Sequence, residues 1–404
     1  MNDGKRTQFR RGSNGRTWHE GCNIGCVPAP LSRIDSLQRK AAGEEDLISF
    51  AGGLPDPKLF PKRELSAAFT SAIAGPRPDA LQYGWPEGQP ELRKWVSERL
   101  RARGAGLEPE QIVITSGAQQ GIALIADLLF KKGDIVGVEA ESYPGALDAF
   151  RARELRLGGL DQPATGYYVM PAVTNPRGTA WSDVERHGLL ESAAKQQSFV
   201  IEDDAYGETV FSGEVQRPLV ADAPDLVFHL GTVSKTLCPG LRVGWLATGR
   251  PELGELLKAK QASDLQAGTL AQEVLAEYAK SGHLESHLAR ARKAYARKAK
   301  LLREAVRRAL PEFQVSEPVG GFSLWLESER EASDVDLLKT AIRHGVSFDP
   351  GSVFRLNKSR TLSLRLCYSC IPEDDIDSGI ERLARALLEF AGENIGPTLA
   401  AKTG

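Results

Sequence analysis

The sequence predicts an α/β fold with a mostly parallel sheet that helices cover on both faces. From residue 47 onward, short apolar runs alternate with longer amphipathic or alanine-rich segments. Strands buried on both faces of a parallel sheet appear as continuous apolar runs, and the crossover between parallel neighbours is usually a helix. We expect buried strands at 112–117, 134–139, 167–170, 198–203, 226–231 and 242–247.

The last third of the chain predicts a smaller α+β unit. Apolar residues recur at steps of three and four between 284 and 309, which indicates one long helix, and Pro311 ends it. The segments 313–327 and 360–369 have the pattern of strands, and 376–391 has that of a final helix. We interpret the many Arg and Lys residues of the long helix as a solvated outer face rather than a nucleic-acid contact.

Composition excludes several classes of protein. The 404 residues include 51 Lys and Arg against 53 Asp and Glu, so the chain is not an overall polycation built to hold nucleic acid or acidic lipid. No apolar run approaches the ~20 residues of a membrane-spanning helix, and no apolar run follows the basic start as it would in an export signal. Five cysteines, an odd count, favour the reducing cytoplasm over a disulfide scaffold.

The segment 231–245 carries the strongest chemical signal. Lys235 follows an expected buried strand among the hydroxyls of Thr232, Ser234 and Thr236, and Arg242 comes just after a Pro-Gly turn. A lysine in this setting suits a Schiff base to a carbonyl, beside a phosphate held by hydroxyls and a guanidinium. The glycine spacing of an ATP-binding loop is absent. Taken alone, the pattern also fits a surface lysine after a strand.

Three further loops follow expected strands at the same edge of the sheet. The turn at 116–118 consists of small residues before a helix, where backbone N–H groups can approach a phosphate. Asp203 ends the strand 198–203, with Tyr206 three residues later. Ligands of α/β folds bind at such strand ends, and a carboxylate there can pair with a protonated ring nitrogen. Asn175 lies in the loop 171–178.

These residues belong to a longer series of strings by which the chain resembles a known family. It is similar to fold-type-I pyridoxal-phosphate (PLP) enzymes of the class I/II aminotransferase family. Within that family it is closest to the branch of 2-aminoadipate aminotransferases and the aminotransferase-like domains of MocR-type regulators. The matching strings are ISFAGGLPDP (48–57), LQYGWPEGQPELR (81–93), TSGAQQGIAL (115–124), SYPGAL (142–147), NPRG (175–178), IEDDAYGE (201–208), GTVSKTLCPGLRVGW (231–245), GVSFDPGSVF (345–354) and LRLCYS (364–369).

The resemblance implies a domain plan. A large PLP-binding domain with a mostly parallel seven-stranded sheet would span 76–285. A smaller α+β domain would combine 47–75 with 286–404, which includes the long connecting helix. Residues 1–46, rich in Gly, Arg and Ser, would form an N-terminal arm.

The resemblance also implies a role for each matched residue. Lys235 would hold PLP as an aldimine, and Asp203 would pair with its ring nitrogen. Contacts to the ring would come from Tyr143, Asn175 and Tyr206, and contacts to the phosphate from Ser116, Gly117, Ala118, Thr232, Ser234, Arg242 and Tyr83 of the partner subunit. The substrate would contact Arg365, Gly53, Asn175 and Arg33, of which Arg33 equally fits a solvated residue.

These roles describe a cytoplasmic homodimer that moves an amino group between an α-amino acid and a 2-oxo acid. The reaction removes the Cα proton, so Lys235 must be neutral to act as a base, and we expect burial and Arg242 to lower its pKa. Another PLP reaction on the same fold, by a lyase, racemase, decarboxylase or cyclase, remains the alternative. We discount a transcription regulator, because the segment before residue 48 lacks the helical periodicity of a DNA-binding domain.

Two departures from the family pattern stand out. The segment 151–170 lacks a helix that the family has, and a parallel crossover normally needs a dozen or more residues. We therefore expect either that the local topology differs or that part of the natural chain is absent. Cys367 occupies a position where the family often has asparagine, which puts the polarity of the pocket in doubt. We expect no metal at His19, Cys22 and Cys26 or at Cys367 and Cys370, because zinc needs four convergent ligands. We also expect Cys238 to be a small packing residue rather than a nucleophile, and His229 to be packed or hydrogen-bonded rather than catalytic.

Overall fold

The computed structural model of the chain describes residues 46–75, 78–357, 359 and 361–394, and it shows an α/β fold. A seven-stranded sheet has the order β2-β8-β7-β6-β5-β3-β4. Within the group β3 to β7, every pair of neighbouring strands is parallel. Strand β8 is antiparallel to both of its neighbours, β7 and β2. All six expected strands are present, in β2 (Ile112–Thr115), β3 (Ile135–Val138), β5 (Gly166–Val169), β6 (Phe199–Asp203), β7 (Val227–Thr232) and β8 (Gly244–Ala247), and β4 (Arg156–Gly158) is added at the edge.

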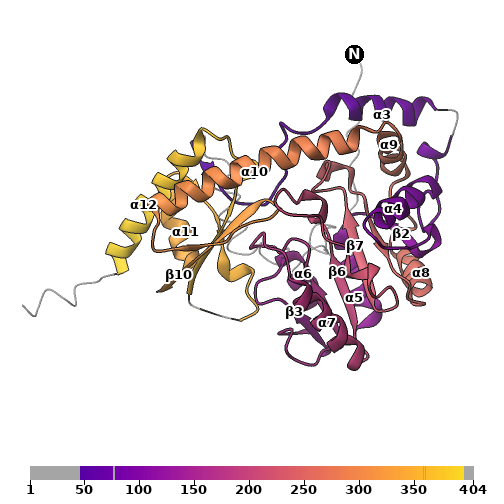
Figure 1. The fold of residues 1–404 in the computed structure, drawn as a ribbon, viewed down its shortest axis with the longest axis horizontal. Coiled ribbons are helices and arrows are strands. Elements are labelled where there is room, and N and C mark those ends of the chain that lie inside the picture. The colour runs from indigo at the N-terminus through magenta and orange to yellow at the C-terminus, as the bar shows by residue number, and fades with distance from the viewer. Residues whose placement is uncertain (1–45, 76–77, 358, 360, 395–404) are drawn as a thin grey trace, which may run out of the picture. The chain divides into compact units, whose positions relative to one another are not determined.

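Helices surround this sheet (Figure 1). Helix α4 contacts β2, α5 contacts β2, β7 and β8, α6 contacts β4, and α7 contacts β6. The strand side chains between them are almost entirely enclosed, which explains why these strands read as unbroken apolar runs. The helices of this part are α3 (Lys62–Ala74), α4 (Pro90–Ala102), α5 (Ala118–Leu129), α6 (Pro144–Ala152), α7 (Asp183–Lys195), α8 (Leu253–Asp264) and α9 (Thr269–Lys280).

The short connection between β4 and β5 shows that our expectation of a different topology was wrong. Both strands run parallel to β3, which lies between them, and residues 159–165 join them without a helix. The register explains why so few residues suffice. The last residue of β4, Gly158, is aligned with Gly137 of β3, and the first residue of β5, Gly166, is aligned with Val136. Between the two strands the chain therefore has to return by only one residue position along β3. Seven residues span up to about 23 Å, which exceeds the ~10 Å across β3.

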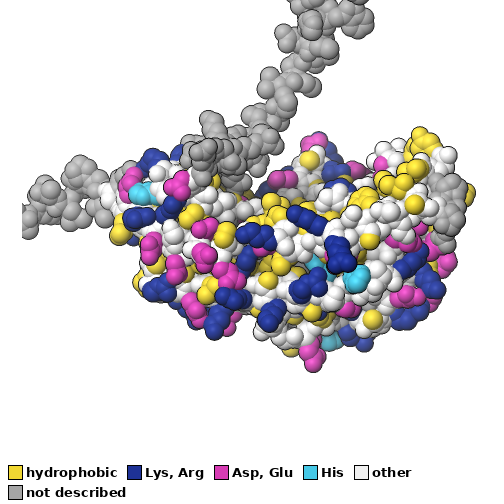
Figure 2. All heavy atoms as spheres, turned by 90° about the horizontal axis from the view of Figure 1, so that it is seen from above, with side chains coloured by type: hydrophobic (Ala, Val, Ile, Leu, Met, Phe, Trp, Pro, Cys, Tyr) yellow, Lys and Arg dark blue, Asp and Glu magenta, His cyan; other side chains and the backbone are white. Residues whose placement is uncertain are grey.

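The long helix α10 (His283–Ala309) connects the sheet to the C-terminal part of the chain (Figure 1). Its apolar stripe from Leu284 to Val306 is buried, as the sequence predicts. Arg290, Lys293 and Arg297 lie on its exposed side. Figure 2 looks onto this side of the molecule and shows basic side chains interspersed with acidic ones. This mixture agrees with a solvated face.

The C-terminal part contains a four-stranded sheet of order β12-β13-β10-β9. Strands β10 (Ser323–Glu331) and β13 (Thr361–Cys367) form its centre, with β9 (Gln314–Val315) and β12 (Asp349–Pro350) at its edges. The expected strand at 313–327 is therefore two antiparallel strands. Helices α11 (Asp334–Arg343) and α12 (Asp375–Asn394) pack together, and β1 (Ile48–Ser49) pairs with β11 (Val346–Ser347).

Short helical turns complete the described chain at Pro78–Leu81, Pro109–Gln111, Gly207–Thr209, Leu219–Ala221, Pro239–Leu241 and Gly351–Val353. Among the residues that the structure describes, no helix combines the length and the hydropathy needed to cross a membrane.

Candidate functional site

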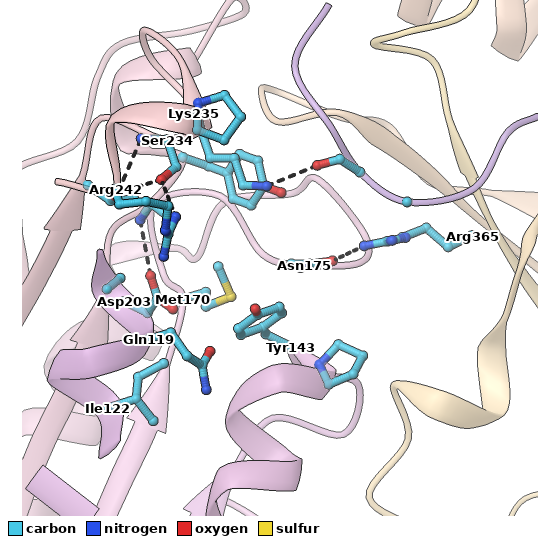
Figure 3. Close-up of a pocket in the computed structure, with 18 residues that line it drawn as sticks. Gln119, Ile122, Tyr143, Met170, Asn175, Asp203, Ser234, Lys235, Arg242 and Arg365 are labelled. Carbon is cyan, nitrogen blue, oxygen red and sulfur yellow. Dashed lines mark hydrogen bonds between the residues drawn. The ribbon is translucent and has the colours of Figure 1, made fainter. Parts of the chain in front are cut away.

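A cavity of about 270 Å³ lies at the carboxyl ends of the parallel strands (Figure 3). The loops after these strands, the start of helices α5 and α6, and strand β13 form its wall. The structure brings most of the predicted residues to this wall: Gly53, Ala118, Tyr143, Asn175, Asp203, Tyr206, Thr232, Ser234, Lys235, Arg242 and Arg365. The sequence analysis missed Gly52, Gln119, Ile122, Pro144, Met170, Ala205 and Pro239, which complete the lining.

Lys235 follows strand β7 and points into the cavity (Figure 3). Its Nζ donates a hydrogen bond to the carbonyl of Gly53 (2.9 Å) and lies 5.6 Å from the ring centre of Tyr206. Burial, followed by the nearby charge of Arg365, lowers the pKa of Lys235 to about 8. The direction is the one that the sequence analysis expected, but the cation responsible is Arg365 rather than Arg242.

An anion cradle lies at the first turn of α5. No side chain caps this helix, so its first N–H groups remain open to a ligand. Arg242 closes the cradle, donating from Nη2 to the carbonyl of Ser116 (3.1 Å) and from Nη1 to Oγ of Ser234 (3.4 Å). The hydroxyl of Thr232 lies 3.0 Å from that of Ser234. A Cβ on Gly117 would come within 2.6 Å of Arg242 Nη2, so the glycine keeps this space open.

These donors fit a phosphate group. The start of helix α5, the hydroxyls of Thr232 and Ser234 and the guanidinium of Arg242 line the same cavity. Each of these groups is a good partner for phosphate oxygens. The buried Lys235 amine and the Asp203 carboxylate line the same cavity. The residues present therefore suit a phosphorylated aldehyde that carries a ring nitrogen.

Asp203 ends strand β6 and is held by two donors. Its Oδ2 accepts from the hydroxyl of Tyr168 (2.7 Å), and its Oδ1 accepts from the N–H of Ala205 (3.2 Å). Burial raises the pKa of this carboxyl, and the hydrogen bond from Tyr168 opposes that rise. A positive charge beside the carboxylate would offset the cost of its burial.

Tyr168 is a functional residue that the sequence analysis missed. It is fully buried and lies in β5, opposite Ile201 of β6. Because side chains alternate along a strand, the residue two positions beyond Ile201 is on the same face of the sheet, and that residue is Asp203. Alignment of the two strands by their apolar runs would have revealed the pair.

His229 lies behind the cavity rather than in its wall. Its Nδ1 is 3.0 Å from Oε2 of Glu202, and both side chains are buried. The same carboxylate accepts from the backbone N–H of Leu219 (2.6 Å). His229 is thus a buried, hydrogen-bonded residue outside the cavity wall, as we expected.

The side chains of two tyrosines, Tyr143 and Tyr206, line the cavity. Tyr143 precedes helix α6 and Tyr206 follows Asp203, and the Tyr206 ring packs edge-on against Phe322. Burial raises the pKa of Tyr143 to about 12 and also raises that of Tyr206. Both side chains are therefore neutral hydrogen-bond donors at physiological pH.

Arg365 reaches the cavity from strand β13, on the side opposite Arg242 (Figure 3). Its Nη1 donates to Oδ1 of Asn175 (3.0 Å). A Cβ on Gly53 would meet Nη1 and Nη2 at 3.4 Å, so the glycine permits close approach to the guanidinium. The sequence analysis missed Asp349, which accepts from Arg365 on its other side.

Four predicted residues are not part of this lining. Ser116 and Gly117 lie in the turn just before α5, where the carbonyl of Ser116 accepts from Arg242. Tyr83 is 78% exposed and lies outside the cavity lining. Arg33 lies outside the described residues, as do His19, Cys22 and Cys26. Within the described ranges, no group of three or more His, Cys, Asp or Glu side chains is placed to hold a metal ion.

Comparison with known proteins agrees with this geometry. The model of the family "Aminotransferase class I and II" matches residues 56–157 and 161–383. A 2-aminoadipate transaminase of Thermus thermophilus is 34% identical over 395 residues, which cover 92% of this chain and 97% of that protein.

Two solved structures are similar to the whole described fold. One is a kynurenine aminotransferase of Pyrococcus horikoshii in complex with PMP, with a TM-score of 0.84 and 32% identity over 90% of this chain and 96% of that one. The other is the α-aminoadipate aminotransferase LysN of Thermus thermophilus with N-(5'-phosphopyridoxyl)-L-leucine, with a TM-score of 0.81 and 32% identity over 89% and 97%. The chain therefore belongs to the class I and II aminotransferase family and is a PLP-dependent aminotransferase of fold type I.

Proposed function

We propose that the cavity around Lys235 is the active site, where an amino group passes between an α-amino acid and a 2-oxo acid. One observation carries this assignment: the amine of Lys235 is buried between an anion cradle, a buried carboxylate and a second guanidinium. Lys235 would attach the cofactor covalently and then serve as the base. PLP, when bound, supplies the electron sink for the pair left at Cα when its proton departs.

The cradle would hold the cofactor phosphate. The N–H groups of Gly117 and Ala118, the hydroxyls of Thr232 and Ser234 and the guanidinium of Arg242 are the proposed ligands, together with Ser116. Asp203 would pair with the ring nitrogen and keep it protonated, because a charge-paired carboxylate favours the cationic form of its partner. Tyr143 would cover one ring face, and Asn175 and Tyr206 would donate to the ring oxygen.

Arg365 would bind the substrate α-carboxylate, with Asn175 and the bare Cα of Gly53 beside it. Fixing the carboxylate aims the Cα–H bond at the amine of Lys235, whose position is set by its own short loop. With a pKa of about 8, roughly one in ten Lys235 side chains is neutral at pH 7. Lys235 would take the Cα proton, hold it on Nζ and deliver it to the cofactor, and the 2-oxo acid would reverse the sequence.

The choice of amino donor depends on residues beyond this wall. The cations that line the cavity are Lys235, Arg242 and Arg365, and each already has a role. A second carboxylate on the substrate would therefore need a cation outside the described lining, for which Arg33 remains the candidate. The names of the relatives offer 2-aminoadipate, kynurenine and aromatic amino acids as the donors to test first.

The enzyme would act as a homodimer in the cytoplasm. Apolar side chains that are more than half exposed occur close together in sequence at Leu81, Tyr83 and Trp85, and Leu265 is 58% exposed. Large exposed apolar residues of this kind are typical of an interface with a second subunit. Tyr83 would then reach the phosphate cradle of the partner. The free thiols of Cys238, Cys367 and Cys370 fit a reducing compartment.

The test is a half-reaction followed by spectroscopy. The purified holoenzyme is mixed with each donor alone, and we expect conversion of the PLP band into that of the pyridoxamine form, reversed by a 2-oxo acid. Consumption of an amino acid without the pyridoxamine form would contradict amino transfer.

A pair of arginine variants tests the carboxylate site. Arg365→Gln should raise KM for the donor about a hundredfold, because charge-assisted hydrogen bonds to the carboxylate are lost. Arg355→Gln is the control, since Arg355 is equally buried but lies beside Glu327 and outside the cavity wall. Equal KM values for the two variants would show that Arg365 does not bind the substrate carboxylate.

A further inference from the structure

A buried carboxylate faces Arg365 on the neighbouring strand. Asp349 of β12 is directly opposite Arg365 of β13 in the antiparallel register. The two residues are 6% and 8% exposed. Oδ2 of Asp349 accepts from Nη2 of Arg365 (2.6 Å), from Nε (3.0 Å) and from the backbone N–H of Gly52 (3.0 Å). The acid is thus part of the site, although it does not line the cavity.

Asp349 occupies one edge of the guanidinium and leaves another edge to the cavity. Nε and Nη2 form the edge that Asp349 binds, and Nη1 donates to Asn175. The bare Cα of Gly53 lies against Nη1 and Nη2, where a side chain would obstruct a ligand. In Figure 3 the guanidinium of Arg365 points toward Asn175 and the centre of the pocket.

No other anionic side chain is in hydrogen-bond contact with this guanidinium among the described residues. The ring of Phe354 lies 4.5 Å from its Cζ. Sγ of Cys367 is 3.7 Å from Oδ2 of Asp349, and burial raises the pKa of this thiol to about 12, so it is neutral. The charge of Arg365 is therefore offset mainly by Asp349.

We propose that Asp349 is a positioning residue that serves as an internal counter-charge for Arg365 and so sets the affinity of the carboxylate subsite. The inference rests on the proposed function, in which Arg365 binds the substrate carboxylate. A buried guanidinium without an anion would be costly, and Asp349 removes that cost while no substrate is bound. When a substrate binds, two carboxylates share one cation, so Asp349 repels the incoming one.

This arrangement has a specific consequence for binding. The charge of Asp349 weakens the affinity for a carboxylate ligand and speeds product release, while its hydrogen bonds keep the guanidinium plane fixed. If the ion pair between Asp349 and Arg365 had only a structural role, it would affect folding stability but not the affinity for carboxylates.

The test uses the PLP-loaded enzyme and its Asp349→Asn variant. Asparagine keeps an oxygen acceptor for Arg365 and removes the charge. Binding of 2-oxoglutarate to the PLP form, which cannot accept an amino group from it, is measured by calorimetry. Thermal unfolding is recorded with and without the same ligand. We expect the dissociation constant to fall about tenfold in the variant.

Thermal unfolding gives a second readout of the same role. Without ligand, Asp349→Asn should melt below the wild type, because Arg365 lacks its counter-charge. With 2-oxoglutarate, the melting temperature should rise more in the variant than in the wild type, since the ligand carboxylate replaces the missing charge. Asp349→Ser, whose hydroxyl also accepts from Arg365, should change the affinity in the same direction and serves if the asparagine variant does not fold.

Asp334→Asn is the matched control. Asp334 is also 6% exposed, lies in the same part of the chain and accepts from the N–H and hydroxyl of Ser352, but it does not touch the site. This variant should lose stability and keep the wild-type dissociation constant within about twofold. An unchanged or increased dissociation constant for Asp349→Asn would overturn the counter-charge role. The donor half-reaction of the wild type, measured separately, decides whether the proposed function itself holds.

Discussion

Tyr168 of β5 donates a hydrogen bond of 2.7 Å to Asp203 at the end of β6, and both side chains are buried. The bond stabilises the charged form of a carboxylate whose pKa burial raises. Tyr168 thereby supports the charge that Asp203 would present to the cofactor ring.

Replacing Tyr168 by Phe should therefore slow turnover by about ten- to a hundredfold, because a hydrogen bond to a charged group contributes about 1.5–3 kcal/mol. The KM for the amino donor should change little, since Tyr168 does not reach the substrate. Steady-state kinetics and cofactor affinity in the same preparation test this. Tyr167→Phe is the control, because that buried hydroxyl bonds Gln162 and Gln196 instead. Equal effects of the two substitutions would refute the role of Tyr168.

Lys235→Ala should abolish both covalent retention of the cofactor and turnover, since the chain would lose its nucleophile and base. Borohydride treatment followed by peptide mass analysis should place the reduced cofactor on Lys235 in the wild type and on no lysine in the variant. Lys235→Arg keeps a cation and should be equally inactive. Amino transfer by either variant would contradict the mechanism.

Cofactor attachment to the apoenzyme should accelerate as pH rises. The pKa of Lys235 is lowered to about 8 by burial, and only the neutral amine attacks an aldehyde. The rate of attachment should increase about tenfold from pH 6 to 7 and level off above about 8, rather than near 10.4 as for a free lysine. Stopped-flow absorbance after mixing with PLP measures it. A rate that continues to rise beyond pH 9 would show that the pKa of Lys235 is not lowered.

Gly117→Ala should lower the affinity for PLP by a larger free energy than it lowers the stability of the fold. Gly117 has a φ of 88°, and an added Cβ would come within 2.6 Å of Arg242 Nη2, where the cradle lies. The strain amounts to about 1–3 kcal/mol, and displacement of Arg242 adds to the loss. Gly133→Ala, with the same φ and open space around it, isolates the backbone cost. If both variants bind PLP equally well, the cradle does not depend on Gly117.

Glu139 should make the stability of the protein depend on pH. Burial raises the pKa of Glu139 to about 7, against an ordinary value of 4.5. Its carboxyl accepts from Trp181 Nε1 (2.9 Å) and Met170 N (3.1 Å), which are at the two ends of the loop that carries Asn175. Because the folded pKa is the higher one, this contribution to stability is full below about pH 4.5. It is lost as pH rises to about 7 and amounts to a few kcal/mol.

Chemical denaturation of the wild type and Glu139→Gln at pH 5 and pH 7 tests this sign. The difference in unfolding free energy between the two pH values should shrink in the variant, whose amide does not titrate. A larger difference in the variant would show that other groups govern this range.

The sequence by itself predicted six strands of the large sheet, the long helix and most of the residues that the structure brings to the cavity. Buried strands produce unbroken apolar runs, and α10 produces a stripe at steps of three and four, so these elements can be read locally. Lys235, Asp203 and Arg242 stand out because strand ends in an α/β fold meet at one edge of the sheet.

Tertiary structure decided what depends on register and on contacts between distant segments. The β4–β5 connection follows from the alignment of Gly158 and Gly166 with β3, which no local pattern reveals. Likewise, Arg365 rather than Arg242 lowers the pKa of Lys235, and Asp349 faces Arg365 across two strands that are 16 residues apart in sequence. Electrostatic and hydrogen-bond partners are selected by distances in space, and spacing along the chain does not fix those distances.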